Sequence, residues 1–173
     1  GIIFASSLSA ENQEEYFREL LKEANRYKRT PLISMERDFT SVGIDSVYFD
    51  SYGNAKKAVQ HLIECGCRKI CHITGAQDLE IARDRVRGYK DCMDENHLPY
   101  DKDMIATGDY SHQSGYTAMK KLLEQVPDMD GVFCGNDQMA IGALKAIKET
   151  GKRIPEDIKI MAYDDVFLSS VVE

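Results

Sequence analysis

Polar side chains follow most of the strand-like apolar runs in this chain of 173 residues. Asn136, Asp164 and Tyr110 each come just after such a run, and ligands of open α/β sheets bind beyond the carboxyl ends of the strands. Carboxylates and amides pair with hydroxyls, arginine donates several N–H groups, and a ring covers an apolar face. The set therefore fits a polyhydroxylated or planar polar ligand. The candidate binding residues are Ser7, Asp50, Arg83, Arg85, Tyr110, Asn136 and Asp164.

The same positions also suit a purely local role. Short polar side chains before a helix accept hydrogen bonds from its first free N–H groups. The residues placed for this role are Asn136 and Asp137 before one expected helix and Asp109, Ser111 and Ser114 before another. Taken singly, each is more often a helix cap than a ligand contact, but together they favour a binding site.

Arginine is unexpected at the start of a helix. Arg83, Arg85 and Arg87 alternate around Asp84 in an expected first turn, where the helix dipole disfavours positive charge. A ligand oxygen, or an acid across the site, would account for Arg85. A simple salt bridge with Glu80 or Asp84 is the alternative.

Enzyme signatures are missing from the sequence. It has no GxxxxGK[ST] phosphate loop, no GxGxxG after a strand, no GxSxG elbow and no HExxH helix. Asp164 and Asp165 could hold Mg²⁺, but no nearby Lys or Ser/Thr pattern completes such a site. We therefore expect no catalysis and no cofactor.

A zinc site is also not expected. Histidines and cysteines are concentrated between residues 61 and 72, but no CxxC pair occurs. A strand around Ile70 would also point alternate side chains to opposite faces. The residues considered are His61, Cys65, Cys67, Cys71 and His72.

Composition limits the partners and the compartment. The net charge of −7 argues against this segment gripping a phosphate backbone, so any nucleic acid would be held by another segment. No stretch approaches the ~18 consecutive apolar residues of a membrane span, so we expect no membrane partner. Five cysteines without the spacing of a disulfide framework indicate free thiols, a reducing compartment and hence a cytoplasmic location.

Strand-like runs alternate with helix-length amphipathic segments, the pattern of βαβ units. We therefore expect a doubly wound α/β fold with parallel sheets flanked by helices. The expected strands are Ile2–Ala5, Leu32–Met35, Val47–Phe49, Ile70–Ile73, Met104–Ala106, Val132–Cys134 and Ile158–Ala162. The second and third runs are joined without room for a helix, which suits the outer edge of a sheet. A turn at Gly66 predicts two lobes, with residues 1–66 part of an N-terminal lobe and residues 67–173 a C-terminal lobe.

Several motifs together resemble the signature region of the lactose-repressor/galactose-repressor (LacI/GalR) family. The resemblance extends over nearly the whole chain, and its order and spacing agree with the family pattern. The motifs are Val132–Ala143 (VFCGNDQMAIGA), Ile154–Ile158 (IPEDI), Ala162–Asp165 (AYDD), Arg85–Tyr89 (RVRGY) and Gly108–Tyr110 (GDY).

The resemblance implies a periplasmic-binding-protein-like core of type I, in which two Rossmann-like lobes close on a small effector. Within it Arg85 matches the effector-clamping arginine, and Asn136 and Asp164 match an amide and a carboxylate of the site. Tyr110 matches the aromatic ring that covers the ligand. The polar contacts of the first lobe match Ser7 and Asp50, and Arg83 is a weaker match. Cys67 and Ala162 depart from the family's usual His and Gly.

The family's DNA-binding head and opening βαβ unit would precede Gly1, and a closing set of elements would follow Glu173. We therefore expect the ligand-sensing domain of a transcriptional regulator, with a carbohydrate-type effector, a homodimer, and operator DNA bound through a segment absent from this chain. The alternatives are a periplasmic sugar-binding protein of an ABC transporter, which the five thiols disfavour, and a small α/β enzyme.

Overall fold

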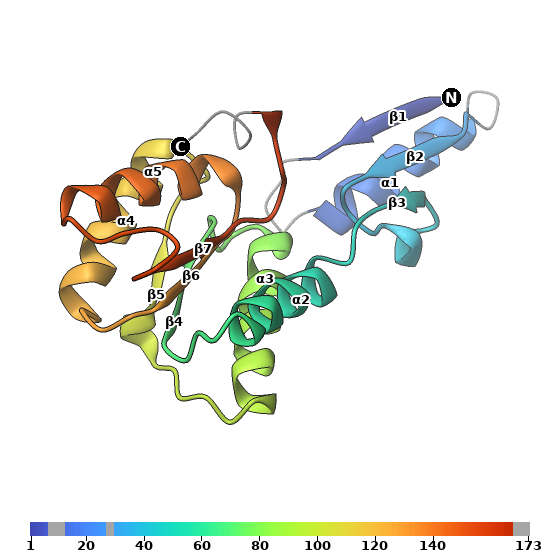
Figure 1. Ribbon diagram of the computed structural model, residues 1–173. Coiled ribbons are helices and arrows are strands. Elements are labelled where there is room, and N and C mark those ends of the chain that lie inside the picture. The colour runs from blue at the N-terminus through green and yellow to red at the C-terminus, as the bar shows by residue number, and fades with distance from the viewer. Residues whose placement is uncertain (7–12, 27–29, 168–173) are drawn as a thin grey trace. The chain divides into compact units, whose positions relative to one another are not determined.

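The computed structural model describes residues 1–6, 13–26 and 30–167, which form two compact units. The first unit contains Gly1–Asp50 with Asp78–Ile81, and the second contains Ser51–Gln77 with Ala82–Glu173. Each unit is built on a parallel sheet of its own (Figure 1). The two parallel sheets expected from the sequence are therefore confirmed. Ser7, one of the candidate binding residues, lies outside the described residues.

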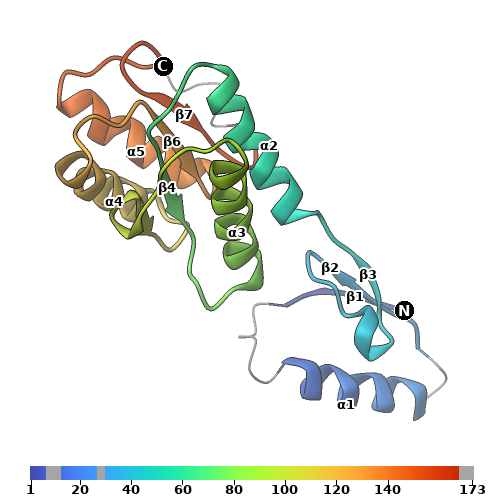
Figure 2. The same cartoon turned by 90° about the horizontal axis from the view of Figure 1, so that it is seen from below.

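The first unit is a three-stranded parallel sheet with one helix against it. Its strands are β1 (Ile2–Ala5), β2 (Leu32–Met35) and β3 (Asp45–Val47), paired in the order β1-β2-β3. Helix α1 (Gln13–Arg26) covers one face, as Figure 2 shows. Phe17 of α1 is buried there, with its ring centroid 5.0 Å from that of Phe4 and 4.2 Å from that of Phe39.

The third strand confirms one expectation and corrects another. It lies at an edge of the sheet and is joined to β2 by a loop with a short 3-10 helix, η1 (Thr40–Val42). The strand expected over Val47–Phe49 instead begins at Asp45, and Phe49 is 76% exposed. Asp45 and Ser46 belong to the strand because they pair with Ile33 and Ser34 of β2, a ladder pairing that apolar patterning does not reveal.

The second unit is a doubly wound, four-stranded parallel sheet, as the βαβ rhythm predicted. Its strands pair in the order β5-β4-β6-β7. They are β4 (Ile70–Thr74), β5 (Ile105–Thr107), β6 (Gly131–Cys134) and β7 (Lys159–Met161). The helices are α2 (Ser51–Glu64), α3 (Glu80–Glu95), α4 (His112–Gln125) and α5 (Asp137–Glu149), and the short 3-10 helix η2 (Lys102–Met104) precedes β5.

Helices cover both faces of this sheet (Figure 1). On one face, Cys71 and Ile73 of β4 pack with Met119 of α4 and Met139 of α5. On the other face, the core combines Ile70 and Phe133 of the sheet with side chains of α2 and α3. Successive side chains of β4 point to opposite faces of the sheet, and helices cover both faces. The run from Ile70 to Thr74 is therefore buried throughout.

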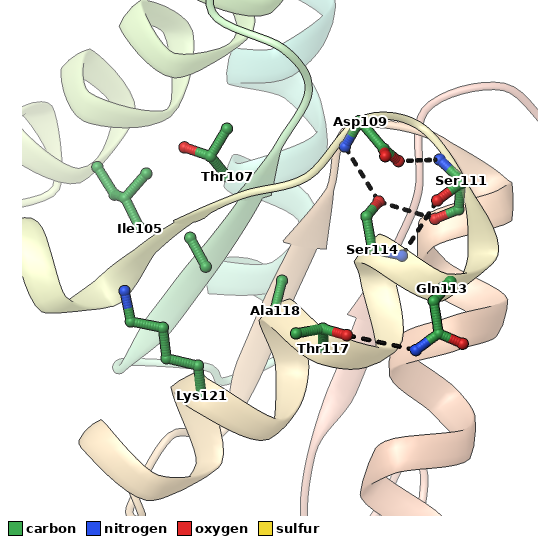
Figure 3. A pocket seen from close by; sticks show the side chains of 10 residues that line it. Ile105, Thr107, Asp109, Ser111, Gln113, Ser114, Thr117, Ala118 and Lys121 are labelled. Carbon is green, nitrogen blue, oxygen red and sulfur yellow. Dashed lines mark hydrogen bonds between the residues drawn. The ribbon is translucent and has the colours of Figure 1, made fainter.

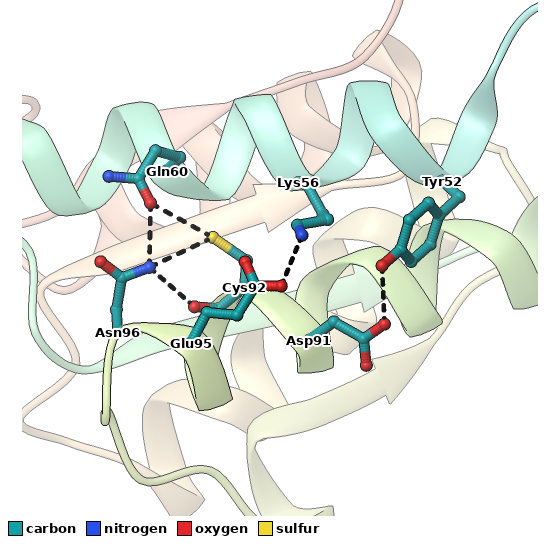
Figure 4. Close-up of polar contacts among 7 residues, drawn as sticks. All are labelled: Tyr52, Lys56, Gln60, Asp91, Cys92, Glu95 and Asn96. Atoms are coloured by element: carbon teal, nitrogen blue, oxygen red, sulfur yellow. Dashed lines mark hydrogen bonds and ion pairs between the residues drawn. The ribbon is translucent and has the colours of Figure 1, made fainter.

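Helix α2 packs within the second unit. Ala55, Val59 and Leu62 are buried in the same core as Ile70. Figure 4 shows the polar contacts that join α2 to α3 along their length. They are Tyr52 Oη to Asp91 Oδ2 at 2.8 Å, Lys56 Nζ to Glu95 Oε1 at 2.7 Å and Asn96 Nδ2 to Gln60 Oε1 at 2.9 Å. The second compact unit therefore begins at Ser51, earlier than the lobe boundary expected after Gly66.

His72 of β4 is buried among aromatic rings. It has no exposed surface, and its ring centroid lies 4.7 Å from that of Phe133 and 5.3 Å from that of Tyr89. Burial lowers the pKa of His72 to about 4, and the charge of Arg85 adds to this effect, whereas the hydrogen bond with the Phe133 carbonyl opposes it. The imidazole is therefore neutral near pH 7.

Helices α4 and α5 touch through glycine. A Cβ atom on Gly142 would lie 2.1 Å from the His112 carbonyl oxygen, and one on Gly115 would lie 2.2 Å from the Met139 carbonyl oxygen. These neighbours are backbone atoms and cannot rotate away. The two helices can pack at this distance because neither position carries a side chain.

The first prediction concerns this contact. Gly142→Ala should lower the free energy of unfolding by about 2 kcal/mol, because the added methyl group forces the two helix backbones apart. Urea denaturation measures the change. Lys121→Ala, an exposed change on α4, is the control and should alter the free energy by less than about 0.5 kcal/mol. An unchanged stability of Gly142→Ala would contradict the packing described.

The second prediction follows from the lowered pKa of His72. The unfolded chain binds a proton at this histidine near pH 6.5, whereas the folded chain does so only near pH 4. Above pH 6.5 the histidine is neutral in both states and does not affect the free energy of unfolding. As the pH falls from 6.5 to 4, the unfolded chain gains a proton that the folded chain does not, and the free energy of unfolding drops by about 3 kcal/mol. In urea denaturation across this range, the free energy of unfolding of His72→Gln should fall by about 3 kcal/mol less than that of the unsubstituted chain. Parallel pH profiles would show that His72 titrates normally.

Candidate functional site

Arg85 of α3 lies at the carboxyl edge of the second sheet. Its side chain is only 8% exposed, and its Nη1 donates a hydrogen bond to the carbonyl oxygen of Gly135, the residue after β6. Its guanidinium carbon lies 3.5 Å from the ring centroid of Tyr163, which follows β7. A residue from the covering helix is therefore held by two loops of the sheet edge, one through a hydrogen bond and one through a cation–π contact.

The local salt bridge considered for Arg85 is not formed. Asp84 pairs instead with Arg87, at 3.0 Å between Arg87 Nη2 and Asp84 Oδ1. Among the described residues, Arg85 has no carboxylate within the 4.0 Å of an ion pair. Its guanidinium therefore makes its short contacts with a carbonyl dipole and an aromatic ring, and no carboxylate of the described residues comes within ion-pair distance.

Arg83 lies apart from this group. It is exposed, and its Nη1 donates to the Gln77 carbonyl oxygen at 2.9 Å. The structure therefore separates two arginines that the sequence grouped together.

Asn136 performs the local role that its position predicted. It is the N-cap of α5, where its Oδ1 accepts a hydrogen bond from Met139 N at 2.9 Å. Its Nδ2 donates to the Tyr110 carbonyl oxygen at 3.0 Å. Asn136 therefore fixes the relative positions of the loops that follow β5 and β6.

Tyr110 turns its ring inward over the end of β4. Its backbone has a φ of 70°, and its ring occupies the space that a side chain on Gly75 would need, with the nearest ring atom 2.0 Å from where a Cβ would lie. The Tyr110 hydroxyl oxygen is buried. The ring of Tyr110 can pack this closely because position 75 carries no side chain.

Two carboxylates, Asp137 and Asp164, come shortly after β6 and β7 at this edge of the sheet. Asp137 is 4% exposed, and its Oδ2 accepts a hydrogen bond from Val166 N at 2.5 Å. Asp164 is exposed, yet partial loss of water around its carboxyl group raises its pKa. Arg85 opposes this rise and Asp137 adds to it, so Asp164 responds to both charges. The carboxylate that reaches the surface of this edge is therefore Asp164.

The sheet edge thus gathers four of the candidate residues, namely Arg85, Tyr110, Asn136 and Asp164. Asp50 is exposed and is the last residue of the first unit before α2. Tyr163 belongs to the AYDD motif but was not among the predicted site residues, although it supports Arg85. Its position directly before Asp164 is the only sequence signal that could have indicated this role.

A hollow lies elsewhere in the second unit, between β5 and α4. It measures about 530 Å³ and includes Asp109, Ser111 and Ser114 among its lining (Figure 3). These residues form the expected helix cap, in which Ser111 Oγ accepts from Ser114 N at 3.1 Å. Hydrogen bonds from Ser111, and then from Ser114, lower the pKa of Asp109 to about 2. None of the candidate binding residues that the structure describes lines this hollow.

The cysteines and histidines do not gather into a metal site in the part of the chain that the structure describes. Cys65 is exposed, with Sγ 3.5 Å from His61 Nε2, whereas Cys67 and Cys71 are buried apart from this pair. Among the described helices, none has both the length and the apolar character needed to cross a membrane.

Known proteins with similar sequences and structures are transcriptional regulators. A family model described as a periplasmic binding protein-like domain matches residues 59–173. The HTH-type transcriptional regulator CelR of Thermobifida fusca is 36% identical over 139 residues, which cover 80% of this chain and 39% of CelR.

Two solved structures share the fold. A sugar-binding transcriptional regulator of the LacI family from Escherichia coli, complexed with phosphate, gives a TM-score of 0.82 at 25% identity, over 98% of this chain and 59% of that chain. The complex of the transcriptional regulator CelR with cellobiose gives a TM-score of 0.83 at 30% identity, over 99% and 51%. The chain spans about half the length of the curated relatives it matches.

The third prediction concerns the double role of Asn136. Asn136→Ala should lower the free energy of unfolding by about 1 to 2 kcal/mol, because it removes the α5 cap and the bond to the Tyr110 carbonyl. Asn136→Asp keeps the capping oxygen and should lose less. Thermal denaturation of both variants measures the difference. Equal losses would show that the cap contributes little.

Proposed function

The chain belongs to the periplasmic binding protein-like domain family, in the form found in LacI-family regulators, and we propose that it is the effector-sensing part of a transcriptional regulator. The observation that carries the proposal is the buried Arg85 guanidinium at the carboxyl edge of the second sheet. Buried cations are rare unless they are paired, so this one needs a functional reason.

The proposed effector site is formed by two kinds of residue. Arg85 and Asp164 contact the effector, one as a donor and the other as an acceptor of hydrogen bonds. Asn136 and Tyr110 hold the loops in place, because their polar groups and ring are already engaged within the protein. The resemblance to the family adds Asp50 and Ser7 as contacts from the first lobe, and Arg83 as a weaker candidate.

A sugar or sugar derivative is the proposed effector class. A carboxylate beside an arginine can pair with the hydroxyl groups of a carbohydrate, since each hydroxyl both donates and accepts. The two solved relatives are complexed with cellobiose and with phosphate, which supports a polar ligand that is rich in oxygen.

The proposed mechanism couples the effector to DNA. An effector that touches both lobes binds the closed arrangement more tightly and shifts the population toward it. In a homodimer this shift would alter operator binding by a head in a segment outside this chain, which is the coupling between two sites that allostery requires. The net charge of −7 supports placing the DNA contact outside this segment, and the relatives' names support a cytoplasmic regulator over an exported binding protein.

The fourth prediction tests the effector site. Thermal shift with a panel that includes cellobiose, monosaccharides, sugar phosphates and inorganic phosphate should identify a compound that raises the melting temperature by several degrees at saturation. Calorimetric titration with that compound should show that Arg85→Ala weakens binding by about tenfold or more, because hydrogen bonds from a charged group are lost.

Arg87→Ala is the matched control. Arg87 lies on the same helix, is 62% exposed in its side chain, and pairs with Asp84, so its removal should leave binding unchanged. A folded Arg85→Ala variant that binds as tightly as the unsubstituted chain would refute the assignment of Arg85.

A further inference from the structure

His72 and Arg85 each carry a buried nitrogen that has no hydrogen-bond partner among the described residues. These atoms are His72 Nε2 and Arg85 Nε. A buried polar atom that lacks a partner costs roughly 1–3 kcal/mol, so such atoms are uncommon in folded proteins. The two nitrogens differ in one respect that matters, because one can accept a hydrogen bond and the other can only donate one.

The surroundings of His72 fix which nitrogen carries its proton. Nδ1 lies 2.9 Å from the Phe133 carbonyl oxygen, which can only accept. Nδ1 therefore bears the hydrogen, and in the neutral ring Nε2 is an acceptor. Stacking between Phe133 and Tyr89 prevents the ring from turning to seek another partner.

Arg85 belongs to α3, the helix that packs on the face of the sheet where the His72 ring stacks on Tyr89. It lies one helical turn before Tyr89 on α3, and Tyr89 stacks on His72 and donates its hydroxyl to the Ile70 carbonyl at 2.7 Å. The Nη1 contact of Arg85 is with Gly135, two positions beyond Phe133 on β6. Arg85 and His72 are thus flanked by the same helix turn and the same strand, and the charge of Arg85 acts on the imidazole.

We propose that His72 is the positioning residue for Arg85, its Nε2 accepting a hydrogen bond from one buried water that in turn accepts one from the Arg85 Nε–H group. This pairing would satisfy both buried nitrogens at once. With Nε–H, Nη1 and the guanidinium face all engaged, the plane of Arg85 is fixed, and the remaining N–H groups are left for the effector. The inference rests on the proposed function, since it assigns Arg85 the effector contact.

The neutral form of His72 suits this role. A protonated imidazole would place a second cation beside Arg85 and remove the acceptor. Burial keeps the ring neutral at ordinary pH, so the acceptor is present there. No acidic side chain among the described residues pairs with Arg85, which leaves the imidazole as a neutral acceptor that avoids a fixed negative charge in the core.

The experiment observes the arginine Nε–H groups of the whole chain by ¹H–¹⁵N spectroscopy, without any effector. Arg85→Lys identifies the Arg85 signal by its disappearance. In the unsubstituted chain this Nε–H should exchange with solvent about tenfold more slowly than that of the exposed Arg87. His72→Phe should keep the ring packing but remove the acceptor, so the Arg85 signal should shift and exchange faster. His72→Gln, which restores an acceptor, should recover much of the protection.

Two results would overturn the inference. One is an Arg85 Nε–H signal that is unchanged in a folded His72→Phe variant. The other, which needs no variant, is exchange of Arg85 Nε–H in the unsubstituted chain as fast as that of Arg87. Because no effector is present, either result leaves the binding role of Arg85 to be decided by the titration of Arg85→Ala.

Discussion

A guanidinium buried without a carboxylate partner among the described residues is the constraint on which the carboxyl edge of the second sheet depends. Arg85 is removed from water but keeps its charge, so every neighbour must compensate for the lost hydration. The Gly135 carbonyl accepts one N–H, and the ring of Tyr163 covers the guanidinium face. The loops after β6 and β7 are consequently tied to α3.

The residues of the proposed site also hold the fold together. Asn136 caps α5 and bonds the loop of Tyr110, and Asp137 in the next position holds the backbone at Val166. These groups are therefore engaged before any ligand arrives. A site built in this way is preorganised, because its loops need not be ordered when the effector binds. Asp164, in contrast, is exposed and can respond to a ligand.

The α/β fold could be predicted from the sequence because it depends on local patterns. Amphipathic segments alternating with short apolar runs require βαβ units, and polar residues after those runs must meet at one edge of the sheet. Arg85 was singled out as a cation in an expected first helical turn, but α3 begins at Glu80, so Arg85 lies in the second turn and is distinguished instead by its burial. The edge position of the third strand followed from a connection too short for a helix.

The remaining features depend on contacts between distant segments, which patterning does not contain. β3 begins at Asp45 because Asp45 pairs with Ile33 of β2, although the apolar residues lie further along the chain. The expected boundary at Gly66 was placed by a turn, whereas α2 packs on the second sheet through Val59. The support of Arg85 by Tyr163, and the placement of His72 beneath the same helix, arise only once α3 has docked.

The most direct test of the central claim is a crystal structure of this chain with the compound that raises its melting temperature. We expect the compound to lie at the carboxyl edge of the second sheet, with hydrogen bonds from the Arg85 guanidinium and to the Asp164 carboxylate. Electron density for the compound in the hollow between β5 and α4, with Arg85 untouched, would contradict it.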